Sequence, residues 1–445
     1  MELRLQTSYR QILGMSLPIS LSMVVPQFNF ITNNIFLGGL GEEELASAGI
    51  TGVYYLIFAV IGNGLSNGLQ VLIARRAGQN LPKEIGRLFL HGVWVALAIA
   101  GCGIVITYVL VPFLFSLTLH NKTIYENVVG FLFIRIWGLP LLYLYVTRNA
   151  LLIGVNQTRL LFWGTLSEAL TNIFFDYGLI YGHFGLPELG FNGAAYASIL
   201  GEGAGLIVIY LIIRKQGLSR RFYFFDRIKI KTSVLKTILW QSTPLIAQYA
   251  LSIMAWTYFY ILIEHHGSLA LAVSSTMRNI FGIFGIFVWA LAATSNTMLS
   301  NIIGQGKQEE GIPLVKRIAT LSFFIVLALC VILNLFPEWI LSFYGQGQGF
   351  ITASRSVIRI ISIALLLFSF GTVWLNAVTG TGNTVFNLVI ELVTLIFYIV
   401  YVYLVLEYWF LPITWGWASE CLYWTTNFLM SFYYIKSGKW KNKDI

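Results

Sequence analysis

The sequence predicts an all-α integral membrane protein, because its charges are few, its apolar runs are long and its two halves repeat. Of 445 residues, 57% are hydrophobic and 11% are charged, whereas soluble domains average about 25% charged residues. So few charges cannot cover a soluble surface of this size, which excludes a soluble globular enzyme and a disordered scaffold. A membrane β-barrel would show short alternating strands instead of continuous apolar runs.

A helix needs about 20 predominantly apolar residues to cross a bilayer. Runs of this length, separated by charged or turn-rich breaks, occur twelve times. Several are long enough to predict tilted helices or helices that extend beyond the hydrocarbon. The predicted spans are 12–37, 46–73, 89–116, 127–153, 160–182, 190–213, 236–263, 270–302, 314–336, 352–379, 385–406 and 409–434.

Positive charge is concentrated in the link 214–236, which carries eight Lys and Arg residues and one acid, Asp226. The turns after the first, fifth and eleventh spans are instead acidic or weakly charged. The positive-inside rule therefore predicts a multi-pass protein of the cell inner (plasma) membrane, with the link and both termini cytoplasmic. We expect no nucleic-acid partner, since the cations lie between membrane spans and not in a soluble domain with base-stacking aromatics.

The two halves repeat at an offset of 226 residues. The corresponding pairs are Pro18 and Pro244, Gly41 and Gly267, Gly78-Gln79 and Gly304-Gln305, and GVNQT at 154–158 and GTGNT at 380–384. Six spans in each half give parallel repeats, which predicts two six-helix lobes around a central cleft. The predicted lobes are residues 1–213 and 237–445, and this arrangement is typical of a transporter.

Arg135 and Arg359 also correspond, at an offset of 224, within the triplets Ile-Arg-Ile. The slightly different offset requires a small length change between the two halves. A position shared by both halves indicates a common packing or lipid-edge role for these arginines.

Several segments resemble the multidrug and toxic compound extrusion (MATE) transporters of bacteria. The resemblance lies in FLGGLGEEELASAG at 36–49, the two Gly-Gln turns, TNIFFDYGLIYG at 171–182, GFNGAAYAS at 190–198 and GTGNT at 380–384, and it covers about residues 10–435. It implies a secondary exporter that expels organic cations and other amphipathic compounds in exchange for sodium or protons.

The predicted fifth span contains Glu168, Asn172 and Asp176, spaced four residues apart. This spacing places the three side chains along one helix face. Ionisable groups within the bilayer are costly and are functional candidates by default, and their oxygens can hold a proton or a sodium ion. The alternative is a structural role in hydrogen bonds that stabilise the lobe.

The MATE resemblance implies that Asn172 and Asp176 belong to the cation site of the amino-terminal lobe. In the family a second acid stands in the first helix, in the motif Asp-Thr-x-x-x-Gly, and here that position is Asn33. Asp176 would then be the main anion, with Glu168 and Glu202 as candidates to replace the missing charge.

The second half lacks this acid, because Asp176 corresponds to Val402 at the offset of 226. Its apolar spans do contain Glu391, while Glu264 lies at the end of the seventh span and Arg278 lies in the eighth. We expect Arg278 to pair with one of these acids, because an unpaired guanidinium in lipid is unfavourable. The alternative is that Glu264, Arg278 and Glu391 belong to a second ion-coupling site.

Aromatic residues such as Tyr54, Trp256 and Trp289 are candidates to line the cleft and stack on flat cations.

The sequence thus predicts a monomeric antiporter for drug-like organic cations in contact with membrane lipid, with no resident cofactor beyond sodium or protons as the coupling ion. The alternative function is a flippase for lipid-linked oligosaccharides from the same superfamily. We expect no enzymatic activity, since no nucleophile-and-base motif and no metal-ligand triad is present.

Overall fold

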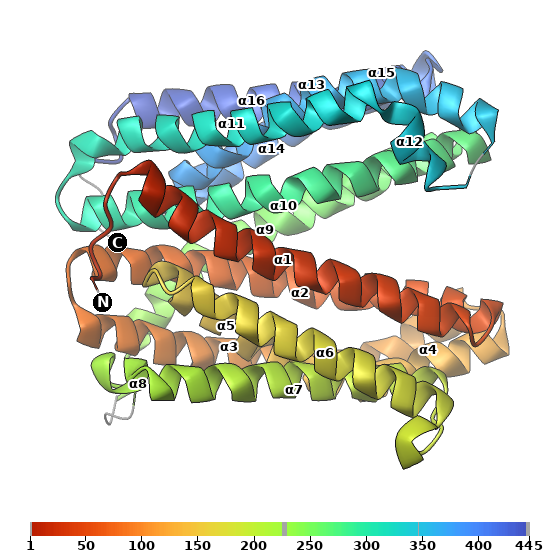
Figure 1. Cartoon of the computed structure of the whole chain (residues 1–445), viewed down its shortest axis with the longest axis horizontal. Coiled ribbons are helices and arrows are strands. Elements are labelled where there is room, and N and C mark those ends of the chain that lie inside the picture. Colours follow the sequence, from red (N-terminus) through yellow and green to blue (C-terminus); the bar gives the residue numbers. More distant parts are fainter. Residues whose placement is uncertain (1, 225–228, 346, 442–445) are drawn as a thin grey trace. The chain divides into compact units, whose positions relative to one another are not determined.

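The computed structural model describes residues 2–224, 229–345 and 347–441, and this part of the chain is helical with short connections and no strand (Figure 1). Asp226, Arg227 and Lys443, which contribute to the predicted charge pattern, lie outside these ranges. Each predicted span corresponds to one helix or to consecutive helices. They are α1 (Tyr9–Gly38), α2 (Glu42–Gly78), α3 (Pro82–Thr118), α4 (Lys122–Arg135) with η1 (Ile136–Gly138) and α5 (Leu139–Gly154), α6 (Arg159–Tyr181), α7 (Phe191–Lys215), α9 (Thr232–Glu264), α10 (Ser268–Gly304), α11 (Gly311–Leu335), α13 (Gln348–Gly380), α14 (Thr384–Val402) with η4 (Tyr403–Tyr408), and α15 (Ile413–Trp417) with α16 (Ser419–Lys436).

Ten helical segments of the described chain are long and apolar enough to cross a membrane. The spans that miss these limits are α6, which carries the polar stripe with Asp176, and α16, which has 18 residues and contains Glu420. The connections contain the short helices η2 (His183–Gly185), α8 (Leu218–Arg221), η3 (Gln308–Glu310) and α12 (Pro337–Ser342).

The chain forms two compact units. The N-terminal unit is Leu21–Ile246, and the C-terminal unit comprises the described residues of Met1–Ser20 and Ala247–Ile445. Both divisions fall two residues after the corresponding prolines Pro18 and Pro244, inside α1 and α9. The units therefore differ from the predicted lobes, since the first part of each half's first helix belongs to the other unit. Each of these helices continues through its proline, so the predicted spans do not reveal the division.

In the N-terminal unit, the first part of α9 approaches α2 closely at two glycines. A Cβ atom at Gly64 would lie 2.7 Å from the backbone nitrogen of Ile246, and one at Gly68 would lie 2.9 Å from the Cα of Ser242. Small residues four apart allow such backbone contact between membrane helices. The Ser242 hydroxyl adds a 3.4 Å hydrogen bond to the carbonyl of Leu65.

The first part of α1 packs in a corresponding way in the C-terminal unit. Ile12 and Met15 are fully buried in a core that includes Leu291, Met298 and Ile302 of α10. This core fixes the beginning of α1 against α10.

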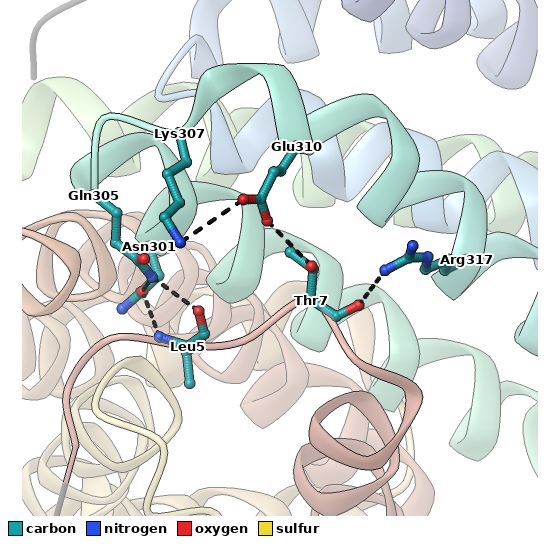
Figure 2. Close-up of polar contacts among 7 residues, drawn as sticks. All are labelled: Leu5, Thr7, Asn301, Gln305, Lys307, Glu310 and Arg317. Carbon is teal, nitrogen blue, oxygen red and sulfur yellow. Dashed lines mark hydrogen bonds and ion pairs between the residues drawn. The ribbon is translucent and has the colours of Figure 1, made fainter.

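Residues 2–8 form an extended strap that precedes α1 and lies against the C-terminal unit (Figure 2). Asn301 of α10 accepts a hydrogen bond from the amide of Leu5 at 3.0 Å and donates one to the carbonyl of Leu3 at 2.9 Å. Gln305 donates to the carbonyl of Leu5 at 2.9 Å. Leu3 and Leu5 are each 3% exposed, so the strap is part of the core and not a loose end.

The strap continues with polar contacts nearer to α1. The hydroxyl of Thr7 donates to Glu310 at 3.1 Å, and Arg317 of α11 donates to the carbonyl of Thr7 at 2.7 Å. Glu310 is also 3.7 Å from the ammonium group of Lys307. The backbone of the strap is thus held mainly by side chains of the C-terminal unit.

Replacing Asn301 with Ala should lower the free energy of unfolding by about 1–3 kcal/mol, because two buried backbone groups of the strap lose their partner. Equilibrium unfolding in detergent micelles measures the change. The same substitution in a chain that begins at Ser8 should cost clearly less. An equal loss in both chains would contradict the proposed dependence on the strap.

Candidate functional site

The polar stripe of α6 contains two buried residues that lack hydrogen-bond partners. Asp176 is fully buried and Asn172 is 2% exposed. Neither carboxylate oxygen of Asp176 and neither polar atom of the Asn172 amide has a partner among the described residues. A buried charged carboxylate needs a compensating group, so this pair is the candidate for binding a proton or a cation.

The end of α1 packs beside the end of α6. Leu37 of α1 and Ile180 of α6 share a hydrophobic cluster, and the hydroxyl of Tyr181 donates to the carbonyl of Phe36 at 2.6 Å. These contacts fix the relative register of the two helices.

Asn33 and Asp176 lie four residues before Leu37 and Ile180, respectively. Because α1 and α6 run in the same direction (Figure 1), the two residues occupy adjoining turns on the side where the helices meet. The Oδ1 atom of Asn33 also lacks a hydrogen-bond partner within the described chain. The amide oxygen of Asn33 is therefore a candidate to join the side chains of Asn172 and Asp176 in binding an ion.

Glu202 of α7, a candidate for the missing second charge, is paired with an arginine. Its two carboxylate oxygens accept hydrogen bonds from Arg135 of α4, one of them at 3.1 Å, and both side chains are nearly buried. The Arg135 guanidinium also lies 4.1 Å from the ring centre of Tyr55. Arg135 therefore already neutralises the charge of Glu202, which disfavours Glu202 as the second acid of the cation site.

Glu168 is half-buried on α6, and its electrostatic neighbours are Glu202, Arg135 and Arg148. Arg148 of α5 is 3% exposed, and its guanidinium donates to the side chain of Asn149 at 2.7 Å. Two arginines thus stand beside two glutamates, which favours a structural role for Glu168. Arg148 was missed by the sequence analysis, although an ionisable side chain inside a predicted span is the same signal that selected Glu168.

The C-terminal unit contains a fully buried acid, Glu391 of α14. It accepts hydrogen bonds from the hydroxyls of Ser252 at 2.6 Å and Tyr423 at 2.7 Å, and from the amide of Gln248 at 3.4 Å. The amide oxygen of Gln248 in turn accepts from Asn387 at 2.8 Å. Donors therefore surround Glu391, in contrast to Asp176.

The expected ion pair of Arg278 with Glu264 or Glu391 is not formed within the described chain. Glu264 and Arg278 are exposed, and the Arg278 guanidinium lies 5.4 Å from the ring centre of Tyr260. The charge of Glu391 is compensated by neutral hydrogen-bond donors and not by an arginine. The sequence-based expectation of an ion pair was therefore wrong.

A second buried acid of this unit, Glu420 of α16, was missed by the sequence analysis. It is 3% exposed and accepts hydrogen bonds from the indole groups of Trp256 at 3.1 Å and Trp424 at 3.0 Å. The signal that could have revealed it is an isolated acid within the predicted twelfth span.

The three aromatic candidates for the cleft lie in different surroundings. Tyr54 is 7% exposed and its hydroxyl is hydrogen-bonded to Thr107 at 2.9 Å, so it belongs to the core of its unit, contrary to expectation. Trp256 is held by Glu420. Trp289 is 44% exposed and contacts Phe368 edge-on, so its ring is the most accessible of the three.

Within the described residues, twelve helical spans in two repeated halves, with buried polar groups inside the apolar helices, are typical of helical membrane transporters. Comparison with known proteins identifies the family. The MatE profile matches residues 18–178 and again residues 244–404, and the chain belongs to the MatE family of transporters. The two matches are displaced by 226 residues at both ends, which confirms the predicted internal repeat.

Individual relatives agree with this assignment. The chain is 22% identical to the probable multidrug resistance protein NorM of Thermotoga maritima over 98% of its own length and 94% of that protein. A 25% identical match to the probable NorM of a Synechocystis strain covers 55% of the chain and 53% of that protein.

The fold also matches solved structures. An outward-facing multidrug resistance MATE transporter superimposes with a TM-score of 0.87 at 19% identity, over 98% of this chain and 97% of that one. A transporter of the same superfamily from Pyrococcus furiosus gives 0.86 at 18% identity, over 97% and 96%. The predicted all-α, twelve-span architecture is thereby confirmed.

Replacing Glu202 with Ala should lower the free energy of unfolding by about 3–5 kcal/mol, because it leaves Arg135 buried without a counter-charge. Equilibrium unfolding in detergent micelles tests this. The control is Glu338→Ala, which removes an exposed ion pair with Arg355 and should cost less than about 1 kcal/mol. Equal losses of unfolding free energy in the two variants would mean that burial does not increase the contribution of the Arg135–Glu202 pair to stability.

Proposed function

We propose that this protein is a cation-coupled antiporter that exports organic cations and other drug-like compounds by alternating access. The observation that carries the proposal is the fully buried Asp176, whose two oxygens have no hydrogen-bond partner in the described chain. Its relatives named as multidrug resistance proteins support the substrate class.

Asp176 can take part in coupling because its charged form requires compensation inside the bilayer. A proton or a cation supplies that compensation, and the transporter state that binds it more tightly gains population. Coupling between linked sites is typically about 1–3 kcal/mol. Gain and loss of the ion can therefore bias the protein between its inward- and outward-facing states.

The ligands offered to a metal ion favour a hard cation. The carboxylate of Asp176 and the amide oxygens of Asn172 and Asn33 are the kind of ligand that sodium, like other hard cations, accepts. With one fixed negative charge, the pocket would become neutral with either a single proton or a single sodium ion. We accordingly propose one monovalent ion per transport cycle.

The buried acids of the C-terminal unit are less suited to this role. Glu391 has three hydrogen-bond donors and Glu420 has two, so both charges are already compensated in part. We propose that these groups hold α9, α14 and α16 together and that ion coupling resides in the N-terminal unit.

We further propose a monomer in the inner (plasma) membrane with both termini and the link 214–236 in the cytoplasm. The basic charge of the link supports this orientation. Transport requires no covalent step, and we propose no enzymatic activity and no resident cofactor beyond the coupling ion.

Replacing Asp176 with Asn should abolish gradient-driven efflux, because the substitution removes the carboxylate and keeps the size of the side chain. The measurement is efflux of a fluorescent organic cation from proteoliposomes with an imposed proton or sodium gradient. The gradient that drives wild-type efflux identifies the coupling ion.

The matched control is Glu391→Gln, which neutralises a buried acid of the other unit in the same way and should retain efflux. Wild-type efflux in Asp176→Asn together with loss in Glu391→Gln would place coupling in the C-terminal unit and refute the proposal. Monodisperse elution of both variants shows that they are folded.

A cysteine placed at Arg220 in a cysteine-free chain should resist a membrane-impermeant maleimide added to intact cells, because the basic link is cytoplasmic. A cysteine at Glu188, in the acidic connection between α6 and α7, should be labelled. Reversal of the two results would overturn the proposed orientation.

A further inference from the structure

A cavity of about 470 Å³ lies in the C-terminal unit where α11 ends, the short α12 follows and α13 passes. Its lining includes Phe336, Glu338, Trp339, Arg355 and Arg359. Arg355 forms an ion pair with Glu338. Arg359 is exposed and has no hydrogen bond or ion pair within the described chain. The lining therefore has one uncompensated positive charge.

This free guanidinium is a specific difference between the halves. Its counterpart Arg135 is held by Glu202 and lies over Tyr55. At the offset of 226, Glu202 and Tyr55 correspond to Phe428 and Phe281. Arg359 has thus kept its place in the repeat while losing the acid that would neutralise it, which leaves it able to bind an anion from outside the protein.

The surroundings of the cavity are those of a membrane surface. Trp339 of α12 and Phe336 beside it are 63% and 57% exposed, and tryptophan is enriched at the level of the lipid headgroups. Towards the interior of the spans, Ile332 of α11 and Ile363 of α13 are 50% and 56% exposed. A headgroup in the cavity would therefore have apolar helix surface beside its acyl chains.

We propose that this cavity binds the phosphate of a membrane phospholipid, with Arg359 as its main ligand. A guanidinium can donate two parallel hydrogen bonds to phosphate. Arg355 lies in the same lining and adds positive charge that is only partly cancelled by Glu338. The apolar surface formed by Ile332 and Ile363 favours a lipid over free phosphate.

The test measures binding of short-chain phosphatidylglycerol to the purified, delipidated full chain by native mass spectrometry. Parallel titrations use inorganic phosphate and a diacylglycerol with the same acyl chains. We expect Arg359→Gln to weaken phosphatidylglycerol binding about tenfold, the effect of losing one hydrogen-bonded charge pair. Arg359→Lys keeps the charge and loses the paired donors, so its affinity should lie between those of wild type and Arg359→Gln, which also controls for misfolding.

The matched control is Arg278→Gln, which removes another exposed arginine of a spanning helix in the same unit and should leave lipid binding unchanged. Equal affinity in wild type and Arg359→Gln, or an equal loss in Arg278→Gln, would overturn the site. Inorganic phosphate that binds as tightly as phosphatidylglycerol would refute a lipid ligand, and diacylglycerol that does so would refute phosphate recognition.

Discussion

Inside a bilayer no water is available, so every polar or charged side chain must find its partner within the protein. Most buried polar groups of this chain meet that requirement: Arg135 with Glu202, Glu391 with its three donors, and Glu420 between two indole groups. Among the buried acids of the described chain, Asp176 stands apart because neither of its oxygens has a hydrogen-bond partner. We interpret this carboxylate as functional because a bound ion can supply the partner that the protein does not.

The sequence was sufficient to predict the all-α fold, the twelve spans and the repeat, because each depends on hydropathy and on turn residues. The same holds for the stripe on α6, since Glu168, Asn172 and Asp176 follow from helical spacing alone. Partners that come from distant segments could not be predicted in this way. Arg135 and Glu202 are 67 residues apart in the chain, and only the packing of α4 against α7 reveals that Glu202 is neutralised.

The two halves have the same order of helices but differ in the groups that compensate their buried charges. Among the buried acids of the described chain, Glu202 of the N-terminal unit is paired with Arg135 and Asp176 has no partner, whereas neutral donors surround Glu391 and Glu420 of the C-terminal unit. Neutral donors hold a carboxylate without adding a compensating charge. Duplication therefore preserved the helices and allowed each half to acquire its own electrostatic character.

The exchange of helix segments between the units bears on how the chain folds during synthesis. Residues of the segment 2–20 pack with helices that are translated more than 200 residues later, and the N-terminal unit is incomplete until the first part of α9 has been made. Domains of many proteins fold one after the other as they emerge from the ribosome. The N-terminal unit must therefore wait for the first part of α9, and the beginning of α1 stays without its final partners until the helices of the second half have entered the membrane.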